Sequence, residues 1–202
     1  MNHLLLFFLL LTSATAFAQT DKAALVAESK RIQEELNADY RDKEKSPLKP
    51  EDLEKFKGHD FFPVSADYII EAELELTENE PVFNMPTTTA RLAEYRKYGY
   101  VVFAFQGETH RLAIYQSPGL MQKPEYADYL FLPFTDQTTG KQTYSGGRYL
   151  EARIPKPGTK ILLDFNRAYN PYCAYNTRYS CPKVPIGNHL EMEVRAGVKL
   201  KK

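Results

Sequence analysis

The sequence lacks the short motifs that mark the common enzyme classes. It contains no P-loop, no G-x-G-x-x-G, no H-E-x-x-H and no G-x-S-x-G pattern. It also lacks an excess of either charge, because basic and acidic residues number 26 each. A balanced charge gives no electrostatic support for nucleic acid or an anionic membrane as a partner. Whether the protein is an enzyme therefore stays open, and the missing motifs weigh against it.

Long apolar runs are also scarce. Residues 4–11 are unbroken Leu and Phe, too short for a bilayer-spanning helix of roughly 20 apolar residues. Residues 16–18 read Ala-Phe-Ala, an A-x-A cleavage site. The pattern predicts a secretory signal peptide over residues 1–18, although the segment before the run carries no Lys or Arg. We expect an exported protein, periplasmic or extracellular after cleavage following Ala18, with no membrane span.

The mature chain is one domain in length. Removing 18 of 202 residues leaves 184, enough for one hydrophobic core. The sequence has no Trp but 14 Tyr and 12 Phe, a composition that favours strands. We predict a single domain over 19–202, with a helical N-terminal segment at 21–57 and a β portion at 64–196.

Residues 21–41 carry the pattern of an amphipathic helix. One apolar stripe recurs at spacings of seven and four residues, formed by Leu25, Ile32, Leu36 and Tyr40. The simplest interpretation is that this stripe covers one side of a sheet. A second, short helix is predicted to begin near Pro50 and to reach Phe56.

After Pro63 the spacing at which apolar residues recur changes from the helical period of about 3.6 residues to the strand period of 2 residues. Residues 70–76 alternate apolar side chains with Glu, which is typical of a half-buried strand. Further strands are predicted at 87–98, 100–105, 111–115, 129–134, 143–150, 160–165 and 190–194. Most are joined by short turns, and no helix alternates with them. The fold class is therefore mainly β, an antiparallel barrel or sandwich of about eight strands preceded by the helix.

Several segments together resemble the bacterial and archaeal DUF1684 family. They are Lys45-Ser46-Pro47-Leu48, Phe61-Phe62-Pro63, residues 132–136, residues 143–150, residues 163–171 and Cys181-Pro182. The resemblance covers nearly the whole mature chain. The family is defined without an assigned function, so it implies no activity.

The two cysteines, Cys173 and Cys181, lie eight positions apart in a proline-containing loop. In an exported chain this spacing predicts a disulfide, which would stabilise the fold by about 2–3 kcal/mol. Two alternatives stay open: free buried thiols, or a metal site that recruits His189. The spacing to His189 fits no standard zinc pattern, so we expect no metal and no cofactor.

A polar cluster surrounds the predicted strand at 160–165. Asp164 and Asn166 share one face of that strand, and Arg148 is expected to face Asp164 from the preceding strand. This pair is either a structural ion pair or the charged floor of a binding site. In the second interpretation the ligand-binding residues are Arg148, Asp164, Asn166, Tyr144, Tyr169 and Asn170.

The function that these features favour is binding of a small molecule or envelope component in a polar pocket around residues 144–170. One alternative is a hydrolase that uses Asp136 or Asp164 as acid or base. Another is a structural or interaction protein of the cell envelope with no small-molecule site, in which helix 21–41 is the docking face. The sequence leaves the ligand and the oligomeric state open.

Overall fold

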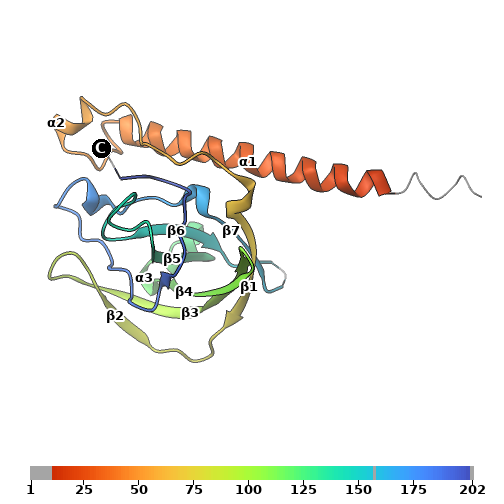
Figure 1. Ribbon diagram of the computed structural model, residues 1–202. Helices are drawn as coiled ribbons and strands as arrows, with labels where there is room; N and C mark the ends of the chain where they lie inside the picture. The colour runs from red at the N-terminus through yellow and green to blue at the C-terminus, as the bar shows by residue number, and fades with distance from the viewer. Residues whose placement is uncertain (1–10, 157, 201–202) are drawn as a thin grey trace, which may run out of the picture.

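The structure is a computed structural model that describes residues 11–156 and 158–200. One antiparallel sheet curls into a nearly closed barrel (Figure 1), which confirms the predicted fold class. Its strands are β1 (Ile69–Leu76), β2 (Val82–Pro86), β3 (Leu92–Phe105), β4 (Glu108–Gln116), β5 (Tyr129–Asp136), β6 (Arg148–Arg153), β7 (Lys160–Asp164) and β8 (His189–Leu190). The strand order is β6-β5-β4-β3-β1-β7, with β2 added to β3 and the two-residue β8 parallel to β5.

The barrel is held by apolar side chains on both faces of its central strands. Along β5, Leu130, Leu132 and Phe134 point into the interior cluster, whereas Tyr129 and Phe131 belong to a second cluster on the other face. Every residue of β5 except one is buried. This explains why β5 reads as a nearly continuous apolar run rather than as an alternating strand.

Two strand predictions need correction. The predicted strands at 87–98 and 100–105 merge into one strand, β3, which begins only at Leu92 and continues through an irregularity between Lys97 and Gly99. The predicted last strand at 190–194 is reduced to β8, because the backbone of Val194 and Ala196 bonds to side chains of β5 and β6 instead of to a neighbouring strand. Strand β2 was not predicted.

Helix α1 (Leu11–Arg41) confirms the predicted helix at 21–41 and extends N-terminal to it. Of its apolar stripe only Tyr40 is buried, while Leu25, Ile32 and Leu36 are half-buried. The helix lies over the side of the barrel where β6 and β7 end the sheet (Figure 1). None of the helices in the described part of the chain is long and apolar enough to cross a membrane.

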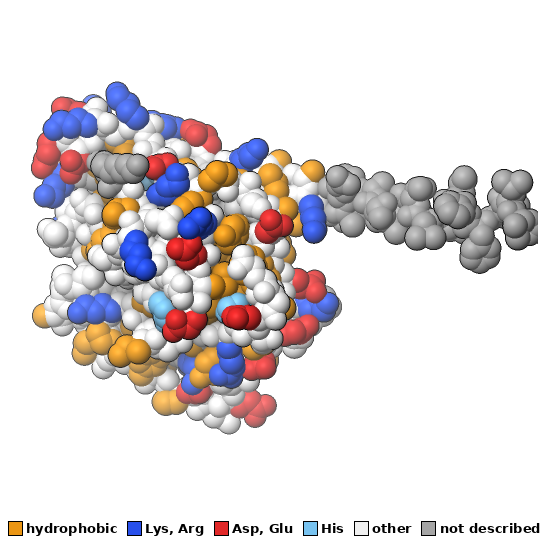
Figure 2. All heavy atoms as spheres, in the orientation of Figure 1, with side chains coloured by type: hydrophobic (Ala, Val, Ile, Leu, Met, Phe, Trp, Pro, Cys, Tyr) orange, Lys and Arg blue, Asp and Glu red, His pale blue; other side chains and the backbone are white. Residues whose placement is uncertain are grey.

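The remaining helical elements are single turns: α2 (Pro50–Leu53), α3 (Pro118–Met121) and four 3₁₀ turns at Ala66–Tyr68, Pro124–Tyr126, Phe165–Arg167 and Tyr172–Ala174. Helix α2 is shorter than predicted. The predicted signal peptide lies partly outside the described residues, since 1–10 are not described and 11–18 belong to α1. Basic and acidic side chains are interspersed over the face shown in Figure 2.

Candidate functional site

Arg148 lies inside the barrel wall and is only 1% exposed. Its guanidinium donates to the carbonyl oxygens of Val194, at 2.8 Å, and of Ala196, and one nitrogen lies 3.5 Å from Asp136 Oδ2. The expected pairing with Asp164 is therefore not formed. The register of β5 with β6, which places Phe134 opposite Arg148, brings Asp136 within reach instead.

Asp136 completes this Arg148 network. It is 2% exposed and accepts hydrogen bonds from the backbone N–H of Val194 at 2.6 Å and from the hydroxyls of Thr138 and Thr139 at 2.9 and 3.0 Å. Burial lowers the pKa of Arg148 to about 10, and the charge of Asp136 opposes that shift, so the arginine stays charged at neutral pH. The network fastens residues 194–196 to β5 and β6.

Asp164 and Asn166 form a second network, which fastens α1 to the barrel. Asp164 Oδ2 accepts from Ser29 Oγ on α1 at 2.6 Å and from Arg167 Nε at 2.7 Å. Asn166 donates to Asp164 Oδ1 at 2.9 Å and exchanges two hydrogen bonds with the backbone of Ser65. The structure thus brings these two predicted residues together in a network that joins α1, Ser65 and Arg167 to the end of β7.

Two further predicted ligand-binding residues, Asn170 and Tyr144, lie apart from both networks. Asn170 Nδ2 donates to the hydroxyl of Tyr175 at 3.1 Å. Tyr144 is half-buried, and burial together with the nearby Cys173 raises its pKa. Neither residue approaches Arg148 through any described hydrogen bond.

The cysteines correct the disulfide prediction, because Cys173 and Cys181 are both free thiols. The Cys181 sulfur accepts a hydrogen bond from the backbone N–H of Cys173 at 3.2 Å, so it packs against the backbone of its neighbour. Burial raises the pKa of the Cys181 thiol to about 11, which keeps it protonated at neutral pH. Among the described residues no group of three or more His, Cys, Asp and Glu side chains is arranged to hold a metal ion.

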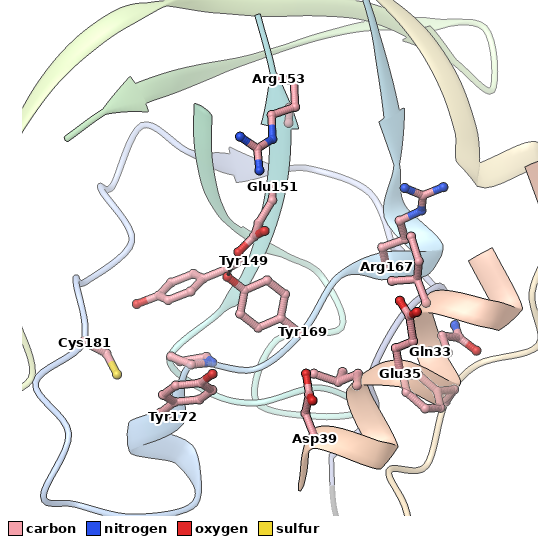
Figure 3. Close-up of a pocket in the computed structure, with 15 residues that line it drawn as sticks. Gln33, Glu35, Asp39, Tyr149, Glu151, Arg153, Arg167, Tyr169, Tyr172 and Cys181 are labelled. Carbon is pink, nitrogen blue, oxygen red and sulfur yellow. Dashed lines mark hydrogen bonds between the residues drawn. The ribbon is translucent and has the colours of Figure 1, made fainter. Parts of the chain in front are cut away.

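A cleft of about 620 Å³ opens between α1 and β6. Figure 3 shows its two walls, with Tyr149, Glu151 and Arg153 along β6 and residues of α1 opposite them. The loop that follows β7 supplies Tyr169 and Tyr172. The full lining comprises Ile32, Gln33, Glu35, Leu36, Asp39, Phe61, Tyr149, Glu151, Ala152, Arg153, Arg167, Tyr169, Pro171, Tyr172 and Cys181.

Glu151 is the central charged group of this cleft. Its Oε1 accepts hydrogen bonds from the hydroxyls of Tyr169, at 2.8 Å, and Tyr129, at 3.1 Å. Burial, and then the charge of Glu151, raises the pKa of both phenols, so they remain hydrogen-bond donors at neutral pH. No hydrogen bond to Glu151 Oε2 occurs within the described ranges 11–156 and 158–200.

The two arginines of the cleft have carboxylate partners of their own. Arg153 donates to Asp128 Oδ1 at 2.9 Å and to the carbonyl of Glu125 at 2.7 Å. Arg167 is bound to Asp164. Each arginine thus already has a carboxylate partner, although Arg153 shares Asp128 with Lys156.

The acidic residues that α1 contributes are compensated in the same way. Glu35 forms an exposed ion pair with Arg31, and Asp39 forms one with Lys45 at 2.9 Å. Glu151, by contrast, has no ion pair among the described residues, since both of its hydrogen bonds come from neutral phenols. Of the charged residues that line the cleft, Glu151 is therefore the one for which no ion pair occurs among the described residues.

Of the ligand-binding residues predicted from the sequence, only Tyr169 lines this cleft, while Cys181, predicted as a disulfide partner, lies on its wall and Glu151 was not predicted. The missed signal was the alternation along β6. There Leu150 and Ala152 face the interior cluster, and Tyr149 and Glu151 therefore face outward. The apolar stripe of α1 was predicted, but its predicted role was to cover one side of a sheet.

The fold and the cleft define a class: a nearly closed, eight-stranded antiparallel barrel with a helix laid over the side where the sheet ends. A family model described as "Protein of unknown function (DUF1684)" matches residues 54–199. The chain belongs to the DUF1684 family, as its resemblance suggested.

A solved relative shares the fold. The solution NMR structure of an uncharacterised protein from Haloarcula marismortui is 32% identical in sequence and superposes with a TM-score of 0.70. The match covers 90% of this chain and 97% of that one. No curated protein matches the sequence.

Proposed function

We propose that this β domain binds a small molecule or envelope component in the cleft between α1 and β6. The observation that carries the proposal is the half-buried apolar face of α1. Ile32 and Leu36 lie on the stripe of an amphipathic helix, yet they line an open cleft together with Tyr149 and Tyr169. Concave sites that combine apolar and aromatic walls with a few polar groups are the usual form of small-molecule sites.

The cleft takes the place of the site first expected around Arg148. Arg148 and Asp136 are buried and satisfied by protein groups, and neither lines the cleft. Asp136 and Asp164, the acid or base candidates of the hydrolase alternative, are both buried, hydrogen-bonded and absent from the cleft lining. This weakens that alternative, because an acid or base must reach the reacting atom. Tyr169 remains the residue common to the sequence-based site and to the cleft.

A cleft-filling substitution tests the proposal. Leu36→Trp places a large ring in the cleft, whereas Ala27→Trp, on an exposed part of α1 outside the lining, is the matched control. Fragments of varied charge are titrated at millimolar concentration and followed by protein NMR. We expect fragments that shift the resonances of Tyr169 to lose binding in Leu36→Trp and to keep it in Ala27→Trp. Equal binding to both variants, or no binding by any fragment, contradicts the proposal.

The same experiment distinguishes small-molecule binding from the alternative of an interaction protein. If α1 served only as a docking face, the tryptophan variants would change association with a protein partner and leave fragments unbound. Fragment binding that competes at the cleft therefore favours the small-molecule function.

Export is part of the proposal and is supported by the sequence alone. The apolar run at 4–11 and the Ala-Phe-Ala segment at 16–18 are the features of a secretory signal. Expression of the full chain in a bacterium, followed by fractionation and N-terminal sequencing, is expected to give a periplasmic or extracellular product that begins at Gln19. An uncleaved product that remains in the cytoplasm contradicts this part.

A further inference from the structure

We infer that the ligand of the cleft is a small organic cation with an apolar body, and that its cationic group binds Glu151. The inference rests on the proposed function, since it names the chemical class that the same cleft selects. It is argued from the charge balance of the lining, from the aromatic walls and from the open edge of β6.

The charge balance favours a cation. The phenols of Tyr129 and Tyr169 both donate to Oε1 of Glu151, which fixes the carboxylate and leaves Oε2 without a hydrogen bond among the described residues. The arginines that could compete for it, Arg153 and Arg167, are bound to Asp128 and Asp164. A cationic ligand would supply the ion pair that Glu151 lacks.

The walls suit the apolar body of such a ligand. Tyr149 and Tyr169 meet edge to face with centroids 5.9 Å apart, and Tyr172, which is 43% exposed, lies at the cleft wall. Aromatic faces attract cations, and they also bury methylene groups. Opposite them, Ile32 and Leu36 of α1 offer apolar surface that the protein itself leaves half-exposed.

The edge of β6 adds polar backbone groups beside Glu151. Tyr149 exchanges its backbone hydrogen bonds with Tyr169, not with β5, and Ile154 N–H bonds to Asp128. Because alternate residues of an antiparallel strand direct their N–H and C=O groups to the same side, those of Glu151 and Arg153 also point away from β5. A primary ammonium at Glu151 can thus donate to the carboxylate and to a backbone carbonyl.

The test compares three probes that share one apolar body: 4-phenylbutylamine, 4-phenylbutanol and 4-phenylbutyrate. Affinities are measured by NMR titration at neutral pH on the full mature chain and on Glu151→Gln. This variant retains an oxygen that can accept from the two phenols, and its melting temperature checks that it folds. Glu35→Gln is the control, because Glu35 lines the same cleft but is paired with Arg31.

We expect the amine to bind about ten-fold more tightly than the alcohol, the size of one charge-assisted hydrogen bond, and the carboxylate to bind most weakly. In Glu151→Gln the amine should fall to the level of the alcohol, and in Glu35→Gln the order should be unchanged. Preference for the alcohol or the carboxylate in the wild-type protein overturns the cation inference but leaves the cleft as a binding site. Failure of all three probes, together with the fragment panel, overturns the proposed function itself.

Discussion

Replacing Arg148 by Met is predicted to destabilise the fold rather than to remove a ligand contact. Methionine keeps much of the apolar volume but lacks the guanidinium that donates to the carbonyls of Val194 and Ala196. It also leaves the carboxylate of Asp136, 2% exposed, without its opposite charge. The segment at 194–196 then has no cation holding it against β5 and β6.

The magnitude follows from the cost of breaking a buried ion pair from one side. Removing one partner costs about 3–5 kcal/mol, a large fraction of the roughly 5–15 kcal/mol that stabilises an ordinary domain. The backbone and hydroxyl donors to Asp136 remain, which places the expected loss near the lower end. Adding Asp136→Asn to Arg148→Met removes the unpaired charge and should restore about 1–2 kcal/mol, a coupling that a double-mutant cycle isolates.

The assay is urea unfolding followed by circular dichroism and by tyrosine fluorescence, which is usable because the chain has 14 Tyr and no Trp. Arg111→Met is the matched control. Arg111 is 51% exposed and pairs with Glu75 on the barrel surface, so its loss should cost less than about 1 kcal/mol. A loss in Arg148→Met no larger than that of Arg111→Met, or no gain from adding Asp136→Asn, would refute the assigned role.

Three further outcomes are expected. Ser29→Ala removes one of the two described hydrogen bonds that hold α1 at the end of β7. It should cost about 1–2 kcal/mol and speed hydrogen exchange in α1, and unchanged exchange would contradict it. Gly99→Ala should cost more than about 2 kcal/mol in urea unfolding, because a Cβ there overlaps the backbone carbonyl of Glu75, while Gly119→Ala, with open space around it, should be nearly neutral. Burial raises the pKa of Tyr95 from 10.0 to about 12. As the pH rises from about 10 to 12, the unfolded chain loses this proton before the folded protein does, so the free energy of unfolding falls. The urea midpoint should therefore decrease over that range rather than stay constant.

The periodicities of the sequence predicted the fold better than they predicted strand boundaries. The alternation of residues 70–76 and the stripe of α1 are local patterns, and both elements are present. The break placed between Tyr98 and Tyr100 is wrong because Gly99 does not end the strand. It is instead the position at which β3 passes so close to Glu75 that a side chain has no room. The need for glycine at this position comes from the neighbouring strand β1, so the residues around Gly99 in the sequence do not reveal it.

The partner of Arg148 could not be predicted for a related reason. Two carboxylates, Asp136 and Asp164, stood near it in the sequence, and the choice depends on which strand is its neighbour. In the sheet β6 pairs with β5, while β7 pairs with β1 on the opposite end of the strand order. Arg148 therefore pairs with Asp136 of β5, and this choice depends on the order of the strands in the sheet.

The polar residues that the sequence singled out still matter for the cleft, although most do not line it. Asp164 holds Ser29, and the carbonyl of Asn166 accepts from Gln33, itself a cleft residue, at 2.7 Å. These two bonds, one helical turn apart on α1, hold the helix against the end of β7. The position of Leu36 relative to Glu151 thus depends on Asp164 and Asn166, neither of which lines the cleft. A substitution at Asp164 would then alter binding through the position of the helix, so loss of binding in such a variant would not identify Asp164 as a ligand contact. Glu151, whose Oε2 accepts no hydrogen bond from the described residues, is the better test of recognition, because its substitution leaves the bonds that position α1 in place.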